Sequence, residues 1–530
     1  MSITPSSTPN VGYQRPELTK NAGKYRMIKD CIEGQEAVKA RGDFYLPRPD
    51  PTNCTEENMM RYNSYLRRAV FYNVLQRTLS GMTGLVFQQQ PEMLMPDDME
   101  VLKVNIDGAG IGAIQQMRKC FKSVLAFGRA GLLTDFPKAR IGEFGESIGF
   151  TRKELMDGEV QPTVTLYMPW QIINWREEYR NGKVMLTQKN SDVVICEQIP
   201  GVTDGFQQDY TPVWRHLYLD EEGNCNQSLW VNTVTKGDKN AQNVSGGALY
   251  VTQENVVLRD SNGLPTVTLK FIPFQFIGSE TNSAEIDPPP MYDLAVLNIA
   301  HYRNSADYEE SCFVTGQPTV WASGLTEAWV EDVLKGELRL GSFGGIPLPA
   351  NAAVGIIQTS PNTQPFEAMK QKEAQMIAIG ARLIRENGKV ERREVEIKNE
   401  AASEASLIVT VAQNVEAAYR KAIEWCGLFY GHPKEEITIN LSYNFIYSQL
   451  TYQERQQLVN EWIAGAITFS EMRSNLKQAG IAKLTDEEAK KLIDEELAER
   501  DAREVAKEAE KNAQAAKNSD GQENNPEKTE

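Results

Sequence analysis

Two long amphipathic stretches, residues 287–314 and 363–386, bracket a segment rich in glycine and proline. Apolar and small residues recur at helical spacing in both stretches, which predicts two helices that run out to a compact tip and back. The predicted faces consist of Met291, Leu294, Asn298, His301, Tyr302, Ser305 and Tyr308 on the first helix, and of Phe366, Met369, Met376, Ile379 and Leu383 on the second. A stalk of two helices has too little surface of its own to cover both faces. The pattern therefore indicates that other copies of the chain cover them.

The segment between these helices, residues 315–362, is predicted to form a small β-containing tip. Glycine and proline recur through it, as expected for a chain that turns several times. Two β-prone runs, Thr319–Trp321 and Val354–Ile357, are able to pair as strands. We therefore expect a folded tip here and not a linker.

A charged interruption at 387–399 precedes a third regular helix at 400–427. The helix carries an almost heptad stripe of small and apolar residues, namely Ala405, Ile408, Ala412, Val415, Tyr419, Ala422 and Cys426. The segments expected further along are a strand at Glu436–Leu441, helices near 451–464 and 470–478, a charged helix from 485 to about 515, and a polar end at Asn518–Glu530. That end has too few apolar residues to offset the entropy of ordering, so it is predicted to be disordered.

The N-terminal half changes in character near residue 160. Before that point the pattern predicts helices at 20–40, from Thr55 to about 80 and at 113–128, with a buried strand at 129–135. From 161 to 280, short runs rich in β-branched and aromatic residues are separated by turns; examples are Thr163–Tyr167, Trp214–Leu219 and Val267–Ile272. The whole chain is therefore predicted to be an α+β protein.

Arginines and aromatic residues interleave in the predicted helix that starts at Thr55. They are Arg61, Arg67, Arg68 and Arg77, with Tyr62, Tyr65, Phe71 and Tyr72. One interpretation is a nucleic-acid surface, since aromatic rings stack on bases and arginine pairs with phosphate. The other is a packed helix whose arginines face solvent or another subunit. The aromatic residues fall mainly among apolar positions, which favours the packed helix.

The composition excludes several classes of protein. A net charge of −16 argues against a protein that coats nucleic acid, and residues 486–530, with 15 acidic and 8 basic residues, carry −7 of it. No apolar run reaches the roughly 20 residues that span a bilayer, and the polar N-terminus has no apolar signal region, so we expect no membrane partner. The seven cysteines are scattered, odd in number and without a C-x-x-C pair, which indicates reduced thiols.

No catalytic or metal-binding motif stands out, and we expect neither a cofactor nor enzymatic activity. The chain has no G-x-x-x-x-G-K-[ST] phosphate loop, and His216, His301 and His432 are isolated from one another. The best enzyme-like signal is Gly108–Ala113, which follows a possible strand at Val101–Ile106. With Asp135 as the ribose-binding acid, it would make a nucleotide-binding loop; the alternative is an ordinary turn before a helix.

Several diffuse sequence patches, taken in order, resemble the portal proteins of tailed bacteriophages, the head-to-tail connectors of these viruses. The patches are residues 61–91, 127–137, 272–274, 294–316, 378–381, 404–425, 462–465 and 468–471, and the resemblance covers roughly residues 20–500. None of them is a catalytic signature. The resemblance rests on the order of these patches. That order agrees with the sequence of helix, tip and helix predicted from the periodicity.

The resemblance implies a ring, typically of twelve subunits, at one vertex of the capsid in the virion, assembled in the cytoplasm of a bacterial host. Double-stranded DNA would be packaged and ejected through the ring. The implied protein partners are the terminase large subunit, a head-tail adaptor or tail proteins, and the major capsid or scaffolding protein. A different structural or adaptor protein of the same virion is the alternative within this class.

The portal architecture, carried onto this chain, implies the following parts. They are a flexible N-terminus (1–19), a wing (20–286; helical over 20–160 and β-rich over 161–286), stem helices (287–314 and 363–386), a clip (315–362), a tunnel loop (387–399), a long wing helix and strand (400–450), a helical crown (451–515) and a disordered acidic tail (516–530).

The tunnel loop is where DNA contact is expected. Its basic residues, Lys389, Arg392, Arg393 and Lys398, alternate with glutamates, which suits weak and transient contact with phosphate. The alternative is an ordinary solvated loop with local ion pairs of little value.

Overall fold

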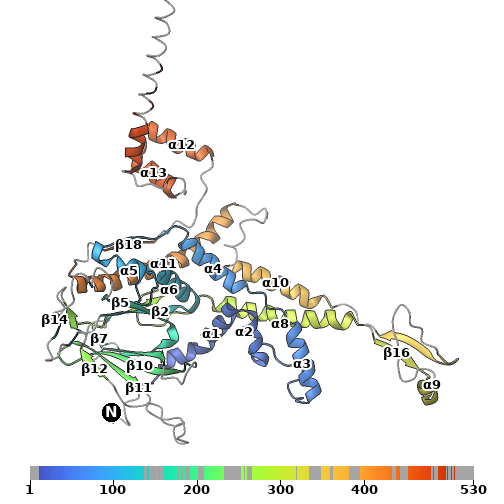
Figure 1. Ribbon diagram of the computed structural model, residues 1–530. Helices are drawn as coiled ribbons and strands as arrows, with labels where there is room; N and C mark the ends of the chain where they lie inside the picture. Colours follow the sequence, from blue (N-terminus) through green and yellow to red (C-terminus); the bar gives the residue numbers. More distant parts are fainter. Residues whose placement is uncertain are drawn as a thin grey trace, which may run out of the picture. The chain divides into compact units, whose positions relative to one another are not determined.

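The computed structural model describes most of the chain up to residue 478 and a few helical residues beyond it (Figure 1). The described residues are 11–136, 140–141, 147–148, 154, 160–176, 178–180, 183–185, 191–200, 208–231, 252–255, 257–259, 265–317, 319–332, 348–357, 362–380, 394–432, 437–441, 452–478, 482, 488–496, 498, 500, 503 and 507. The chain divides into two compact units, Met1–Tyr443 and Asn444–Glu530, which are treated separately below. Helices and small antiparallel sheets are mixed throughout the first unit, so the fold is α+β.

The first predicted helix is two helices, α1 (Pro16–Glu33) and α2 (Gln35–Ala40). They are separated by Gly34, whose φ of 98° lies in the region that favours glycine. A 3-10 turn at Gly42–Phe44 follows them. The backbone N–H of Arg15, just before α1, donates to the carbonyl of Ile173 (3.1 Å) and ties the start of α1 to the β-rich part of the unit.

The prediction of one continuous helix from Thr55 to about 80 is wrong, because the structure has two helices with a break between them. The structure has α3 (Glu56–Arg68) and α4 (Val74–Val86), with five residues between them. Asn73 caps α4 by accepting a hydrogen bond from the Gln76 N–H (3.0 Å). The local apolar spacing continues across the break, so periodicity alone could not reveal it.

The region that leads into the first sheet contains β1 (Glu92–Leu94), a 3-10 turn (Asp97–Met99), α5 (Val101–Val104), α6 (Ala113–Phe127) and β2 (Arg129–Asp135). The predicted helix at 113–128 and the predicted strand at 129–135 are confirmed. Between them, Gly128 has a φ of 77°, and a Cβ there would lie 2.8 Å from the carbonyl oxygens of Asp287 and Pro288. Only glycine fits this close crossing of two chain segments.

Two antiparallel sheets dominate the β-rich part. The smaller has the order β15-β2-β5, with β5 at Thr163–Tyr167 and β15 at Phe274–Gly278. The larger has the order β12-β11-β10-β9-β6, formed by Thr252–Asn255, Cys225–Val231, Tyr210–Leu219, Asp192–Pro200 and Ile172–Arg176. A 3-10 turn (Pro169–Gln171) precedes β6. The remaining pairs are β3 (Arg140–Ile141) with β4 (Ser147–Ile148), β7 (Glu178–Arg180) with β8 (Lys183–Met185), and β13 (Val257–Arg259) with β14 (Pro265–Thr268).

A half-buried polar cluster joins the two sheets. Arg215 of β10 contacts Glu197 of β9 (2.9 Å) and Asp135 at the end of β2 (3.5 Å). The hydroxyl of Tyr167 in β5 donates to the same Glu197 (2.5 Å). Each of these groups bonds to a residue on another strand, so the cluster connects the smaller sheet to the larger one.

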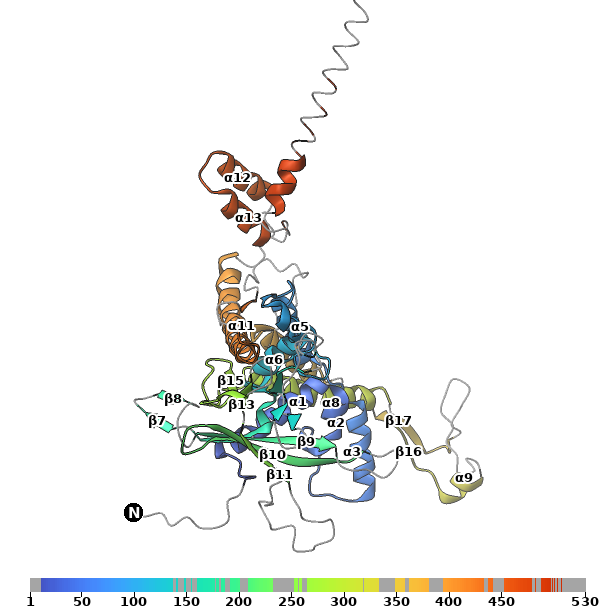
Figure 2. The same cartoon turned by 60° about the vertical axis from the view of Figure 1, so that its left-hand side comes forward.

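The second half of the first unit begins with α8 (Tyr292–Thr315) and continues through β16 (Thr319–Ser323), α9 (Glu327–Asp332), β17 (Ala353–Ile357), α10 (Gln364–Ala378) and α11 (Glu394–Tyr430). Helix α10 packs along α8, and the pair leads to the segment with β16, α9 and β17, here called the tip (Figures 1 and 2). The predicted order of helix, tip, helix and long helix is confirmed.

Helix α11 is the central helix of the core in the first unit. It packs on α6, β2 and β15, and the predicted stripe from Ile408 to Cys426 is fully buried. The Tyr419 hydroxyl donates to Gln116 of α6 (3.0 Å), and the Gln116 amide donates to the Val164 carbonyl of β5 (2.7 Å). The predicted strand after the helix is β18 (Thr438–Asn440), which pairs with β1.

The second unit, as far as it is described, is helical. It contains α12 (Tyr452–Ile463), α13 (Phe469–Gln478) and a helical segment at 488–496. Thr468 and Glu471 cap α13 reciprocally: the Glu471 N–H donates to the Thr468 hydroxyl (3.2 Å) and the Thr468 N–H donates to the Glu471 carboxylate (2.8 Å). These helices match the two predicted at 451–464 and 470–478.

Candidate functional site

Helix α8 is fixed to the break between α3 and α4 by buried polar side chains. The Asn298 carbonyl oxygen accepts hydrogen bonds from the Val74 and Leu75 N–H groups (3.2 and 3.1 Å), and its amide donates to the Tyr72 carbonyl (2.8 Å). Two turns further on, the Ser305 hydroxyl accepts from the Val70 N–H (3.1 Å). Residues 61–91 and 294–316, which are more than 200 positions apart in the sequence, are therefore held together by these hydrogen bonds.

A second set of contacts braces α8 with α3. The Tyr65 hydroxyl donates to Asp307 (2.6 Å), and Arg68 forms an ion pair with Glu310. The Arg68 guanidinium also lies 4.1 Å from the centre of the Phe313 ring. Through these contacts α3 supports the half of α8 that leads to the tip.

The region of interleaved arginines and aromatic residues is thus packed, as the packed-helix interpretation predicted. Tyr62, Tyr65 and Phe71 are buried, so their rings are not available to stack on bases. Tyr72 is the exposed member of the set, and Arg77 lies over its ring at 5.5 Å. The nucleic-acid interpretation of this helix is not supported by the burial of its aromatic residues.

The α8–α10 pair leaves much of its apolar surface uncovered. On α10, Met376 is buried, whereas Phe366 and Ile379 are 40% and 45% exposed. Phe366 rests against Tyr308 of α8, with ring centres 5.7 Å apart. The predicted face of α8, by contrast, is buried from Met291 through Ser305, because α3, α4 and α1 cover it as well as α10.

One polar contact crosses between the two helices. His301 of α8 is 2% exposed, and its Nε2 lies 3.4 Å from a carboxylate oxygen of Glu373 on α10. Burial lowers the pKa of His301, and the contact with Glu373 opposes that shift only in part.

The tip is a two-stranded antiparallel sheet with exposed apolar faces. Val320 is opposite Ile356 and Trp321 is opposite Gly355, which confirms the pairing predicted from the sequence. The Trp321 ring covers Gly355, where a Cβ would lie 2.7 Å from the indole nitrogen. Large apolar side chains in the strands remain exposed; they are Trp321 (42%), Val354 (46%), Ile356 (64%) and Ile357 (60%). A two-stranded sheet of this kind is marginally stable by itself, so the tip is suited to packing against another surface.

The predicted DNA-contact residues are only partly covered by the structure. Lys389, Arg392 and Arg393 lie outside the described residues. Lys398, predicted to be in the loop 387–399, belongs to α11, which begins at Glu394 and not at 400. The prediction interpreted the alternating charges of residues 387–399 as the sign of a loop. Glutamates at the start of a helix are favoured by the helix dipole, which explains the earlier start.

The glycine-rich segment at 108–113 does not form a dinucleotide-binding loop. The strand predicted at Val101–Ile106 is wrong, since α5 occupies 101–104. The loop amides are already used within the loop: Ala109 and Ile111 donate to the Asp107 carboxylate, and Gly110 donates to Asn105. Asp135 is engaged with Arg215. The backbone N–H groups that would hold a pyrophosphate are therefore occupied, and the turn interpretation is the one that fits.

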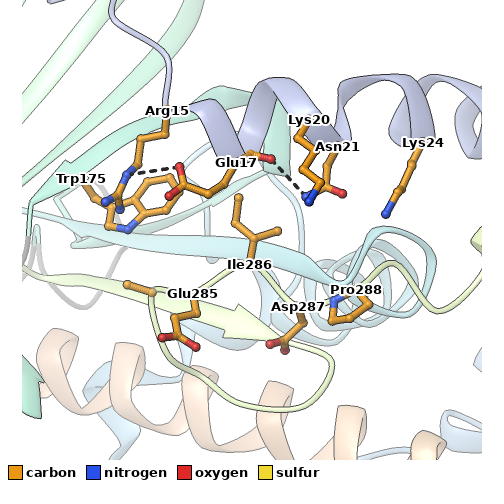
Figure 3. Close-up of a pocket in the computed structure, with 11 residues that line it drawn as sticks. Arg15, Glu17, Lys20, Asn21, Lys24, Trp175, Glu285, Ile286, Asp287 and Pro288 are labelled. Carbon is orange, nitrogen blue, oxygen red and sulfur yellow. Dashed lines mark hydrogen bonds and ion pairs between the residues drawn. The ribbon is translucent and has the colours of Figure 1, made fainter. Parts of the chain in front are cut away.

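A cavity of about 570 Å³ lies between α1 and the segment that enters α8 (Figure 3). Arg15, just before α1, and Lys20 and Lys24 of α1 face Glu285 and Asp287 across it. Arg15 lies over the Trp175 ring at 4.4 Å, and the Asp287 carboxylate accepts from the Glu280 N–H (2.7 Å). The lining contains no serine, cysteine or histidine. The lining residues therefore include no Ser–His or Cys–His pair, and their charged groups are cations and carboxylates.

The three histidines occupy separate places, each beside one carboxylate. His216 contacts Asp192 (3.1 Å), and His432 contacts Asp98 (2.7 Å). All seven cysteines are free, and burial raises the pKa of Cys31 and Cys225 to about 12. Within the described ranges, no three His, Cys, Asp or Glu side chains are grouped as a metal site would require. None of the helices in these ranges has the length and apolarity needed to cross a bilayer.

Comparison with known proteins gives a family match over part of the chain. The profile of a domain of unknown function (DUF4055) matches residues 290–430. The matched segment starts two residues before α8 and ends at the last residue of α11, so it coincides with the paired helices, the tip and the long core helix. No curated protein matches the sequence.

Among solved structures, the chain is similar to one from "Neck of empty GTA particle computed with C6 symmetry". The sequence identity is 13%, the match covers 86% of this chain and 100% of the other, and the TM-score is 0.40. A TM-score below 0.5 does not establish that two chains share a fold.

Proposed function

We propose that this protein is a portal: a ring-forming, non-enzymatic subunit at a unique capsid vertex of a tailed bacteriophage. In this proposal α8 and α10 are the stem, the tip is the clip, and double-stranded DNA passes through the ring during packaging and ejection. The clip docks the terminase large subunit and later an adaptor or tail protein. The capsid or scaffolding protein surrounds the ring.

One observation carries the proposal. The paired helices and the tip expose large apolar side chains that the described part of the chain leaves uncovered, among them Phe366, Ile379 and Ile356. Burying apolar surface contributes about 25 cal/mol per Å², so association is favoured. Identical subunits that meet through two different faces form a closed ring when the rotation between them permits it. The sequence resemblance to portal proteins, independent of this argument, supports the same assignment.

The test is native mass spectrometry of the purified full-length protein, with negative-stain imaging. We expect a closed ring with a central hole. The double variant Phe366→Ser/Ile379→Ser should shift the population toward monomers. The matched control is Val104→Ser, which removes a 73% exposed apolar residue of α5, outside the paired helices and the tip. A wild-type protein that stays monomeric at micromolar concentration would contradict the proposal.

The non-enzymatic part of the proposal has its own test. Without a phosphate loop, and with the 108–113 amides occupied, we expect no ATP hydrolysis by the purified ring. Energy for packaging would come from the docked terminase. Turnover that persists through repeated purification would instead favour a nucleotide-binding enzyme.

A further inference from the structure

Two neighbouring helices of this acidic chain carry no acidic residue. Of the described helices with ten or more residues, α4 and α6 are the two without Asp or Glu. They pack against each other, with the Phe87 and Phe121 rings 6.0 Å apart at the contact. The chain as a whole has a net charge of −16, so this absence makes the surface of the two helices locally basic.

The cations of α6 lie on its outer face. Gln115, Arg118, Lys119 and Lys122 form this face, here called the α6 ridge, while Gln116, Met117, Cys120 and Phe121 point into the core. At 1.5 Å per residue the ridge is about 10 Å long. Gln115, Arg118 and Lys119 are exposed, and Lys122 is half-buried.

The cations of the ridge have no ion-pair partner in the part of the chain that the structure describes. Among the described residues, no carboxylate forms an ion pair with Arg118, Lys119 or Lys122, although other surface cations, such as Lys103 and Arg176, do have one. Like charges four residues apart on a helix are destabilising by a few tenths of a kcal/mol. The α6 ridge therefore bears a small repulsion that no partner in the described structure relieves.

The surroundings of the ridge favour an anionic ligand. The Arg118 guanidinium lies 5.4 Å from the centre of the Phe87 ring, which restricts its position. Residues 88–90, directly after Phe87, are three exposed glutamines. Glutamine amides and arginine are both donors to phosphate oxygens, and neither adds a repelling negative charge.

We propose that the α6 ridge is a binding site for the phosphate backbone of double-stranded DNA. This inference rests on the proposed function, which supplies DNA as the ligand, and it adds a contact site outside the segment 387–399. A ridge of about 10 Å is as long as about three base-pair steps along the duplex axis, at 3.4 Å each. Because the site offers cations and amides and no base-reading geometry, we expect binding without sequence preference.

The test uses fluorescence anisotropy with a labelled 40-base-pair duplex and the assembled full-length protein, over a series of salt concentrations. The variant is Arg118→Gln/Lys119→Gln/Lys122→Gln. We expect it to bind roughly tenfold or more weakly near 0.15 M salt, and to lower the slope of log K against log salt by about 2.7, for three lost phosphate contacts. The charge-keeping variant Arg118→Lys/Lys119→Arg/Lys122→Arg should bind like the wild type.

The matched control removes three exposed cations from α1, a helix that retains its own carboxylates: Lys20→Gln/Arg26→Gln/Lys29→Gln. It should leave both affinity and slope nearly unchanged. Three results would overturn the inference: no DNA binding by the wild-type protein, an equal loss from the α1 variant, or a ridge variant that binds normally. If the ridge variant instead loses subunit association at low salt in the absence of DNA, the ridge binds an acidic protein surface and the DNA assignment is wrong. Whether the wild-type protein forms a ring is measured separately by mass spectrometry, so failure of this inference would leave the ring proposal intact.

Discussion

At the scale of single residues, the side chains that organise this protein are buried polar ones. Asn298 accepts hydrogen bonds from the first N–H groups of α4, and its amide donates to the Tyr72 carbonyl in the break before α4. A buried side chain of this kind satisfies backbone groups that would otherwise be left without partners. Losing such a side chain costs more than the hydrogen bond itself contributes.

Replacing Asn298 by Ala should lower the free energy of unfolding by about 2–3 kcal/mol, because the Leu75 N–H loses its buried acceptor and the Tyr72 carbonyl keeps only its hydrogen bond from the Val74 N–H (2.9 Å). Chemical denaturation monitored by circular dichroism measures this change. The control is Asn21→Ala on α1, where the amide makes one exposed hydrogen bond to the Glu17 carbonyl; we expect less than about 0.5 kcal/mol there. Equal effects at the two positions would contradict the proposed role of Asn298.

The stability of the α8–α10 contact should depend on pH through His301. Its pKa is lowered in the folded state, mainly by burial, so the folded state favours the neutral ring. That contribution is fully present above the ordinary histidine pKa of about 6.5 and is lost as the pH falls through the lower folded value. Denaturation between pH 7.5 and 5 should show a smaller loss of stability in His301→Gln than in the wild type. His432→Gln, at a more exposed site, serves as the comparison, and identical pH profiles for His301→Gln and the wild type would contradict the argument.

At the scale of elements, the contrast is between α11 and the α8–α10 pair. Helix α11 buries its stripe within its own chain, against α6, β2 and β15. The paired helices and the tip expose theirs in part, which is why we assign assembly to them and not to α11. The DUF4055 match covers α8, the tip, α10 and α11 in one segment, residues 290–430.

The basic residues at 387–399 remain a predicted DNA contact. Changing Lys389, Arg392, Arg393 and Lys398 together to Gln should reduce packaging or retention of DNA while the ring forms normally, because four potential phosphate partners are lost. Packaged DNA per particle, measured by nuclease protection, tests this. The control changes Glu391, Glu394 and Glu396 to Gln, which should not reduce packaging. Unchanged packaging in the basic-residue variant would favour the ordinary solvated loop.

At the scale of the whole molecule, charge is distributed unevenly. Of the net −16, −7 belongs to residues 486–530, whereas α4 and α6 together carry four cations and no anion. If the protein is a portal, as proposed, this distribution would let an acidic chain repel DNA in general and contact it at a few basic places. Such an arrangement is suited to a protein through which DNA must move without being held.

The polar end of the chain should be dispensable for assembly. A protein that stops at Lys517 loses no apolar anchor, since Asn518–Glu530 contains no large apolar residue, so we expect rings of the same subunit number. Native mass spectrometry of the truncated and full-length proteins measures this directly. The comparison is truncation after Gln478, which also removes the helical segment with the buried Ala489; loss of the ring on removal of the last 13 residues alone would give them a structural role.

Sequence periodicity determined the features that depend on neighbouring residues. It predicted the buried stripe of α11, the order of helix, tip and helix, and the pairing of Thr319–Trp321 with Val354–Ile357, because these follow from apolar spacing and turn residues close in the chain. It also indicated that the aromatic residues near Tyr62 pack inside.

Only the tertiary structure decided the features that depend on distant residues. The break between α3 and α4 is stabilised by Asn298, more than 200 positions away, and no local signal encodes that partner. In Val101–Ile106, burial of Leu102 and Ile106 fits a strand and a helix equally well. Val104 would share their face in a strand, yet it is 73% exposed, so packing selects the helix. The α6 ridge is of the same kind: its residues are plain in the sequence, but their shared exposed face on α6 is a property of the fold.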